Sequence, residues 1–259
     1  NFERGNIDMA LMDGKGCVIA GGAGSLGLAS ARALLAEGAK VLLVDQSQDA
    51  LDDAAGGLAG EVLTQVADVT KREDTEAYIT KAVEAWGGID LTFANAGVSG
   101  TNAPITEYPE DVFDEVIDVN IKGAFLALKY AIPHMRSGGS VIVTSSIMGV
   151  QARPNSVAYI TSKHALVGMV RCVAREVAPQ NIRVNILAPG PISNDFQQAI
   201  EDRMSNMMDV DATDMLNQMI PLGRHSEPDE VAKSVLFLAS DMSSFSTGSV
   251  FMADGGFNA

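Results

Sequence analysis

Short runs of apolar residues recur along the chain and are separated by longer segments with helical spacing. The runs lie at 16–20, 41–44, 62–66, 89–94, 140–144, 183–187 and 249–252. Segments such as 28–39, 111–135 and 159–178 repeat their apolar residues as amphipathic helices do. Because most runs are continuously apolar rather than alternating, they fit strands covered on both faces. The pattern predicts a doubly wound α/β fold, a parallel sheet with helices on both faces.

One segment breaks this alternation of strands and helices. Residues 194–222 are helical throughout and rich in methionine, which predicts a small helical lobe inserted over the sheet's edge. Residues 1–13 precede the first strand as an extension. Since no internal stretch has the composition of a linker, residues 14–259 are predicted to form one domain.

Composition and charge narrow the class of protein. The 259 residues are 47% hydrophobic and 20% charged, and the formal net charge is −15. This charge repels phosphate backbones, so nucleic acid and anionic membranes are unsuitable partners. No run of 18 apolar residues and no basic signal-like start is present, and we expect a cytoplasmic protein.

The potential metal ligands show no pattern of a metal site. Cys17 and Cys172 lie in apolar segments and are predicted to be reduced core residues. Two cysteines do not form a zinc cage alone, and the three histidines lack ligand spacing relative to one another. We therefore expect no metal.

A glycine-rich segment follows the first predicted strand and opens the first helix. Backbone amides and the positive end of a helix favour a pyrophosphate there. Asp45 ends the second strand, where a carboxylate accepts hydrogen bonds from ribose hydroxyls and repels a 2′-phosphate. Neither Gln46 nor Ser47 is basic, so NAD is predicted in preference to NADP. The alternative for Asp45 alone is a solvated turn residue at a strand end.

A second group of residues carries candidate chemistry. Tyr159 and Lys163 are four positions apart at the start of a helix and share one face. An ammonium beside a phenol favours the phenolate, which makes Tyr159 a candidate acid and base. Ser146 ends an apolar strand, at the edge where open α/β sheets bind ligands. Alone, Tyr159 has the simpler alternative of packing at a helix end, and Ser145 is predicted to face the other side of the strand.

Taken together, these motifs resemble the classical short-chain dehydrogenase/reductase family. The glycine segment is similar to the family's T-G-x-x-x-G-x-G loop, with Ala20 in place of the threonine and Ser25 in place of the middle glycine. Asn194 stands where the family has threonine after its P-G motif. The remaining motifs occur in order: Asp68-Val69, Asn95-Ala96-Gly97, Pro189-Gly190 and the terminal Asp254-Gly255-Gly256.

The resemblance implies a Rossmann-like fold and assigns roles to individual residues. The catalytic set is Asn120, Ser146, Tyr159 and Lys163, in which Asn120 holds a water that connects Lys163 to solvent; a cap or a helix kink at Asn120 is compatible with this role. The cofactor contacts are Gly21, Gly24, Ser25, Leu26, Gly27, Asp45, Gln46, Asp68, Val69, Asn95, Ala96, Gly97, Tyr159, Lys163, Pro189, Gly190 and Ile192. The substrate contacts are Ser146, Ile147, Met148, Gln151, Tyr159 and Phe196, with Val150 and Asn155 as further candidates.

The leading hypothesis is an NAD-dependent oxidoreductase of the CH-OH group. It would transfer a hydride between nicotinamide and a secondary alcohol or ketone, a hydrophobic or alicyclic small molecule. The alternatives are a 3-oxoacyl carrier-protein reductase, which would need NADPH and a basic docking surface, and a catalytically silent NAD-binding regulator. The resemblance also implies a homo-oligomer, a dimer or a tetramer.

Overall fold

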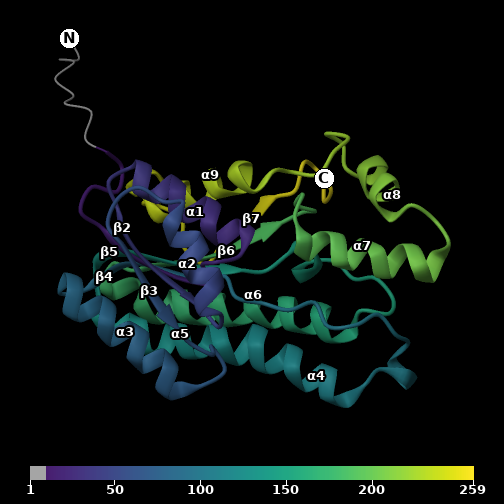
Figure 1. Cartoon of the computed structure of the whole chain (residues 1–259), viewed down its shortest axis with the longest axis horizontal. Helices are drawn as coiled ribbons and strands as arrows, with labels where there is room; N and C mark the ends of the chain where they lie inside the picture. The colour runs from purple at the N-terminus through teal and green to yellow at the C-terminus, as the bar shows by residue number, and fades with distance from the viewer. Residues whose placement is uncertain (1–9) are drawn as a thin grey trace, which may run out of the picture.

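The computed structural model describes residues 10–259, and a seven-stranded parallel sheet runs through its centre (Figure 1). The strands lie in the order β3-β2-β1-β4-β5-β6-β7, so consecutive strands leave β1 first toward one edge and then, from β4, toward the other. Their bounds are Gly16–Ala20 (β1), Lys40–Asp45 (β2), Val62–Val66 (β3), Ile89–Ala94 (β4), Met135–Thr144 (β5), Arg183–Pro189 (β6) and Val250–Ala253 (β7). The predicted parallel α/β architecture is confirmed.

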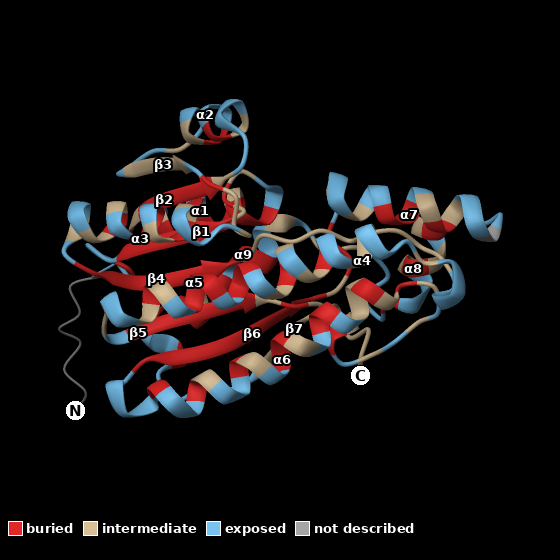
Figure 2. Ribbon diagram, turned by 90° about the horizontal axis from the view of Figure 1, so that it is seen from below, coloured by how far each residue is buried: buried red, intermediate tan, exposed pale blue. Residues whose placement is uncertain are grey.

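Helices cover both faces of the sheet, and the central strands are buried between them (Figure 2). One apolar cluster joins the strands to α1, α2 and α9, and two others join them to α3, α5 and α6. The helix bounds are Ser25–Ala36 (α1), Gln48–Gly56 (α2), Arg72–Trp86 (α3), Glu110–Ile117 (α4), Gly123–Ala131 (α5), Val157–Val177 (α6), Asp195–Met208 (α7), Ala212–Met219 (α8) and Pro228–Ala239 (α9).

The helix predicted over 111–135 is interrupted in the structure. A π-helical turn, Asp118–Lys122, separates α4 from α5, and Met135 already belongs to β5. Proline lacks an amide hydrogen and disfavours helical geometry in the preceding residue, which explains why α5 gives way to a 3₁₀ turn at Ile132–His134. The π turn places Asn120 in the buried interior.

The methionine-rich segment forms α7 and α8, which lie beyond the carboxyl ends of the strands rather than along an edge strand (Figures 1 and 2). The side chains of Asn194 and Asp211 cap the amino ends of these helices. Met204 packs with Ile200 and Ala212 in a small apolar cluster of its own. The segment leaves from the end of β6, which explains its position over that end of the sheet.

The two cysteines differ in their environment. Cys17 is fully buried in β1, as predicted. The prediction for Cys172 was wrong, because this residue lies on the exposed side of α6 with its Sγ 3.2 Å from Glu176 Oε1. An apolar sequence neighbourhood includes both faces of a helix, and only one of them packs on the sheet.

The predicted amino-terminal extension is described only in part. Residues 1–9 lie outside the described residues, whereas Ala10 to Gly14 form a turn in which Met12 packs into the apolar cluster beside α1. Between residues 10 and 259, no helix has both the length and the apolar character needed to cross a membrane.

Candidate active site

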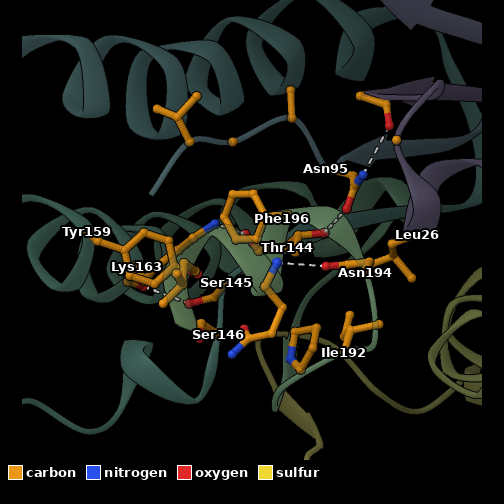
Figure 3. Close-up of a pocket in the computed structure, with 18 of the residues that line it drawn as sticks. Leu26, Asn95, Thr144, Ser145, Ser146, Tyr159, Lys163, Ile192, Asn194 and Phe196 are labelled. Carbon is orange, nitrogen blue, oxygen red and sulfur yellow. Dashed lines mark hydrogen bonds between the residues drawn. The ribbon is translucent and has the colours of Figure 1, made fainter. Parts of the chain in front are cut away.

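A cavity of about 400 Å³ opens at the carboxyl ends of β1 to β6. It lies where the strand order switches between β1 and β4, the usual ligand site of an open α/β sheet. Asp45 and Gln46 line one part of this pocket, and Ser146 and Tyr159 line another. Figure 3 shows Tyr159 and Leu26 on opposite sides of this pocket. The pocket is therefore long enough to connect the two groups of residues singled out in the sequence.

The glycine-rich turn requires glycine at two positions. Gly21 has φ +73°, and a Cβ there would lie 2.8 Å from the amide nitrogen of Ala96. A Cβ on Gly27 would collide with the carbonyl oxygen of Gly21. Ser25 is the first residue of α1 and has no positive φ, so serine fits the position at which the family has its middle glycine. The cradle at the helix amino end is therefore preserved despite this departure.

The second strand ends in a carboxylate that faces the pocket. Asp45 Oδ2 accepts a hydrogen bond from Ala23 N at 3.2 Å, and Oδ1 accepts one from Gln46 N at 2.8 Å. Hydrogen bonds from the Thr70 hydroxyl and amide lower the pKa of Asp68, which also lines the pocket. These contacts fix both carboxylates at the end of the pocket that a nucleoside would occupy, and they leave the glycine cradle open beside them.

At the other end of the pocket, Tyr159 and Lys163 lie together in the first turns of α6. Lys163 Nζ lies 5.5 Å from the centroid of the Tyr159 ring and donates a 2.9 Å hydrogen bond to the carbonyl of Thr144. Ser146 follows β5 and caps a 3₁₀ turn, accepting a hydrogen bond from Met148 N at 3.1 Å. A phenol, an amine and a hydroxyl thus converge on the pocket, as the sequence predicted.

Burial changes the acidity of both ionisable groups in this cluster. It raises the pKa of the Tyr159 phenol above its ordinary value of 10.0, and contacts with Ser146 and Arg153 lower this pKa only in part. It lowers the pKa of Lys163 from 10.5 to about 8. The sequence predicts that the ammonium depresses the pKa of the phenol, but in the protein alone burial has the larger effect. The pair therefore needs a further positive charge nearby before Tyr159 ionises easily.

Asn120 lies behind the cluster and does not line the pocket. Its side chain exchanges two hydrogen bonds with the backbone of Val98, at 2.8 Å and 2.9 Å, and donates a third to Ser162 Oγ at 2.9 Å. The π turn that carries Asn120 is the helix kink that the sequence left open as an alternative. Asn120 thus connects the loop after β4 to the helix that bears Lys163.

Two neighbours of the predicted residues hold the site together. Thr144 Oγ1 donates to Asn95 Oδ1 at 2.9 Å, and Asn95 Nδ2 donates to the Gly21 carbonyl at 3.2 Å. This chain links the end of β5 to the glycine turn. Ser145, which was predicted to face the other side of the strand, lines the pocket, and its hydroxyl donates to the Lys163 carbonyl of α6 at 2.9 Å.

Most of the predicted contact residues line the pocket, but a few do not. Gly27 and Asn120 lie behind it, and Gln151, Val150 and Asn155 are absent from its lining. Sequence reasoning missed Thr144 and Arg153, both of which line the pocket. The signal for Thr144 was its place at the end of an apolar strand, whereas nothing in the pattern marked Arg153. The predicted residues that line the pocket are Gly21, Gly24, Ser25, Leu26, Asp45, Gln46, Asp68, Val69, Asn95, Ala96, Gly97, Ser146, Ile147, Met148, Tyr159, Lys163, Pro189, Gly190, Ile192 and Phe196.

A parallel sheet with a glycine turn opening its first helix defines the class of dinucleotide-binding α/β proteins. Comparison with known proteins specifies the family. Residues 21–258 match the family model described as Enoyl-(Acyl carrier protein) reductase. The chain is 38% identical over 250 residues to the 3-oxoacyl-(acyl-carrier-protein) reductase of Thermotoga maritima, covering 95% of this chain and 98% of that protein. It is 34% identical over 254 residues to the 2,5-dichloro-2,5-cyclohexadiene-1,4-diol dehydrogenase of Sphingobium indicum, covering 97% and 100%.

A solved structure gives the same result. The crystal structure of levodione reductase superposes with a TM-score of 0.91 at 35% identity, covering 95% of this chain and 98% of that one. The levodione reductase of Leifsonia aquatica is 36% identical over 252 residues, covering 93% of each chain. The chain belongs to the short-chain dehydrogenase/reductase family. It is an oxidoreductase, and membership of the family implies a nicotinamide cofactor.

Proposed function

We propose that the protein is an NAD-dependent oxidoreductase of secondary alcohols and ketones, with Tyr159 as its acid and base. The observation that carries this proposal is the cluster of Tyr159, Lys163 and Ser146 at one end of a pocket whose other end holds Asp45. When bound, the nicotinamide ring supplies the hydride acceptor or donor. The Tyr159 phenol takes the hydroxyl proton during oxidation and returns it during reduction.

The other residues of the cluster have distinct roles in this proposal. Ser146 donates a hydrogen bond to the reacting oxygen and orients it toward Tyr159. The Lys163 ammonium stabilises the phenolate, since opposite charges attract at this distance. Asn120 fixes the loop and helix that carry these groups through its bonds to Val98 and Ser162. It also holds the water through which Lys163 exchanges protons with solvent.

The choice of NAD rests on Asp45. A carboxylate at the end of β2 accepts hydrogen bonds from the ribose hydroxyls and repels a 2′-phosphate. The residues that line the pocket around it are Gly21, Gly24, Ser25, Gln46 and Asp68, and none of them is basic. Both features favour NAD over NADP.

The substrate of this proposal is a hydrophobic or alicyclic alcohol or ketone. Apolar side chains line the pocket beside Tyr159, and the relatives described above include enzymes named for a cyclic diol and for levodione. The apolar lining comes from Ile147, Met148, Phe196, Ile200 and Leu216.

Turnover of a panel of secondary alcohols, with NAD and with NADP, tests the proposal. Tyr159→Phe removes the proton-transfer group and should lower kcat by ~10²-fold to 10⁴-fold, while fluorescence titration shows unchanged NADH binding. Tyr130→Phe, on α5 and away from the pocket lining, is the matched control and should keep full activity. Full activity of Tyr159→Phe would exclude the mechanism.

A 3-oxoacyl carrier-protein reductase is the second candidate, because the relative from Thermotoga maritima carries that activity in its name. Asp45 and the net charge of −15 oppose it, since the reaction would need NADPH and an acidic carrier. Faster reduction of a 3-oxoacyl thioester with NADPH than of any ketone with NADH would favour this candidate. A silent NAD-binding regulator would show no turnover in any of these assays.

A further inference from the structure

Two arginines without a carboxylate partner lie near the substrate side of the pocket: Arg153 is part of its lining, and Arg203 lies outside the lining, next to the Met204 that Arg153 contacts. Arg153, in the loop before α6, lines the pocket and donates to Ser156 Oγ at 3.2 Å and to Met204 Sδ at 2.8 Å. Arg203, on α7, donates to Ser99 Oγ at 2.7 Å. Over residues 10–259, neither guanidinium has an acidic oxygen within 4.0 Å.

The chain has 33 acidic and 18 basic residues, and three other described arginines also form no ion pair, namely Arg171, Arg175 and Arg183, but none of these three lines the pocket. Arg32, Arg72, Arg136 and Arg224 all form ion pairs with carboxylates. A thioether and two hydroxyls are weak partners for a guanidinium, because none of them carries a negative charge. The two arginines therefore retain positive charge that the protein leaves unneutralised.

The surroundings of Arg153 and Arg203 make their positive charges energetically unfavourable. The Nε of Arg203 is buried and has no hydrogen-bond partner among the described residues. Burial lowers the pKa of Arg153, the charge of Tyr159 raises it, and the charge of Arg203 lowers it again. Two like charges at a partly desolvated site destabilise each other, and an anion placed between them would remove that cost.

Besides Asp45 and Asp68 at the other end, a third carboxylate lines the same pocket. Glu115, on α4, is exposed to solvent and forms no ion pair with either arginine. Water and salt screen an exposed charge of this kind over distances beyond direct contact. Glu115 therefore does not neutralise Arg153 or Arg203.

We propose that Arg153 and Arg203 form a subsite for a carboxylate of the substrate, which is then a hydroxy acid or an oxo acid with an apolar body. The planar guanidinium presents two parallel N–H groups that match the two oxygens of a carboxylate. The apolar side chains beside Tyr159 contact the body of the molecule, and the carbinol carbon faces the phenol. This inference rests on the proposed oxidation of secondary alcohols at Tyr159 and specifies the class of alcohol.

A matched pair of alcohols tests the subsite: 4-hydroxycyclohexanecarboxylate and its methyl ester. The acid should be oxidised with a kcat/KM ~10-fold or more above that of the ester, the size of effect expected for charge-assisted hydrogen bonds. Arg153→Gln and Arg203→Gln should each bring the ratio of the two kcat/KM values toward one. Arg175→Gln removes a positive charge from the exposed last turn of α6 and should leave the ratio as it is. A ratio of one or less in the parent protein, or a ratio that neither Arg153→Gln nor Arg203→Gln changes, would overturn the subsite.

A binding measurement separates this inference from the proposed reaction. Calorimetry on the complex with NADH should show that cyclohexanecarboxylate binds more tightly than cyclohexanecarboxamide. Arg153→Gln should weaken the binding of the carboxylate ~10-fold. If no alcohol is turned over but the protein still binds the acid more tightly than the amide, the proposed reaction is wrong and the proposed subsite is supported. Equal binding of acid and amide would overturn the subsite whatever the activity. Arg203→Lys, which keeps the charge but loses the fork, should give an intermediate effect and controls for damage to α7.

Discussion

The side-chain amide of Asn194 donates a 2.9 Å hydrogen bond to the hydroxyl of Ser25, joining residues 169 positions apart. These are two of the positions at which the chain departs from the pattern of its family. The other end of the same amide caps α7, since Asn194 Oδ1 accepts from Gln197 N at 2.8 Å. One side chain thus ties the first turn of the substrate lobe to the first residue of α1, so the two departures act together.

Separating the cap from the tie tests this relationship. Asn194→Ser keeps a capping oxygen but is too short to reach Ser25, whereas Asn194→Ala loses both contacts and should destabilise the start of α7 by ~1 kcal/mol. Hydrogen exchange over residues 194–200 should be faster in both variants and fastest in Asn194→Ala.

Ser25→Gly provides the matching change at the other partner. It should accelerate hydrogen exchange over residues 194–200 about as much as Asn194→Ser does. The double variant Ser25→Gly/Asn194→Ser should show no further acceleration, because both changes remove the same Asn194–Ser25 hydrogen bond. Additive effects in the double variant would show that the two residues act independently.

The order in which Lys163 and Tyr159 lose their protons is a second prediction. With the pKa of Lys163 lowered to about 8 and that of Tyr159 raised above 10.0, the lysine should titrate first in the protein alone. Lys163 is then charged below its pKa and neutral above it, while the phenol is still protonated. The midpoint of the rise in phenolate absorbance of the parent protein, corrected with Tyr159→Phe, should therefore lie above pH 10.

Oxidised cofactor should change this order. Its positive ring favours the phenolate, so the same absorbance should appear at lower pH when NAD⁺ is bound. A Tyr159 signal below pH 9 without cofactor would contradict the effect of burial. The rise of kcat/KM for alcohol oxidation with increasing pH should also move to higher pH in Arg153→Gln, because the Arg153 charge lowers the pKa of Tyr159.

Cofactor choice is a third prediction. Asp45→Asn keeps an oxygen that accepts from the backbone at 2.8 Å but removes the charge that repels a 2′-phosphate. The ratio of kcat/KM with NAD to that with NADP should fall ~10-fold or more, mainly because KM for NADP decreases. Asp49→Asn, in the first turn of α2, is a control of equal charge change. An unchanged ratio in Asp45→Asn would remove the argument for NAD.

The buried carboxylate of Glu201 is the basis of a fourth prediction. It is 3% exposed and accepts hydrogen bonds from Thr213 Oγ1, from Gln197 Nε2 at 2.7 Å and from His225 Nε2 at 2.6 Å. Burial raises its pKa, but these hydrogen bonds lower it more, so the net pKa lies below 4.5. A carboxylate whose pKa is lowered by folding stabilises the folded state at any pH above its ordinary, unfolded pKa. This contribution is lost as the pH falls through the pKa of the folded state.

Glu201→Gln should therefore loosen α7 and α8 at neutral pH. The loss of charge-assisted bonds corresponds to ~1.5–3 kcal/mol, and hydrogen exchange should increase over residues 195–219. Asp202→Asn, its exposed neighbour, breaks only a surface contact with Gln198 and should leave exchange nearly unchanged. In the parent protein the same segment should become less protected below pH 4.5 than above it; protection independent of pH would contradict the assignment.

The strands of the sheet were predictable because parallel strands buried on both faces leave a continuous apolar record. Asp45 and Ser146, at the carboxyl ends of two strands, followed from that record, whereas Asn95 was predicted from its resemblance to a family motif. The π turn at Asp118–Lys122 was not predictable, since its residues differ little from those of a regular helix. Helix burial likewise depends on which face meets the sheet, which explains the error at Cys172.

The chemistry of the substrate end was the least predictable part. Arg153 and Arg203 are 50 positions apart, and each alone is typical of a solvated surface residue. What distinguishes Arg153 is that it lines the pocket without a carboxylate partner, and such a combination depends on the whole surrounding structure. Gln151 was predicted as a substrate contact, but it is absent from the lining, whereas Ile147 and Met148 of the turn at Ile147–Gly149 line the pocket.

The switch in strand order between β1 and β4 has a consequence for how this molecule can change. The loops after β1, β2 and β3 supply Asp45, Asp68 and the glycine cradle, whereas residues after β5 and β6 supply the surroundings of Tyr159. The preference for the nucleotide and the preference for the alcohol are thus determined by residues in separate halves of the chain. A chimaera joined within β4 would inherit one preference from each parent, with the Asn95 to Thr144 hydrogen bond as the contact that the junction must preserve.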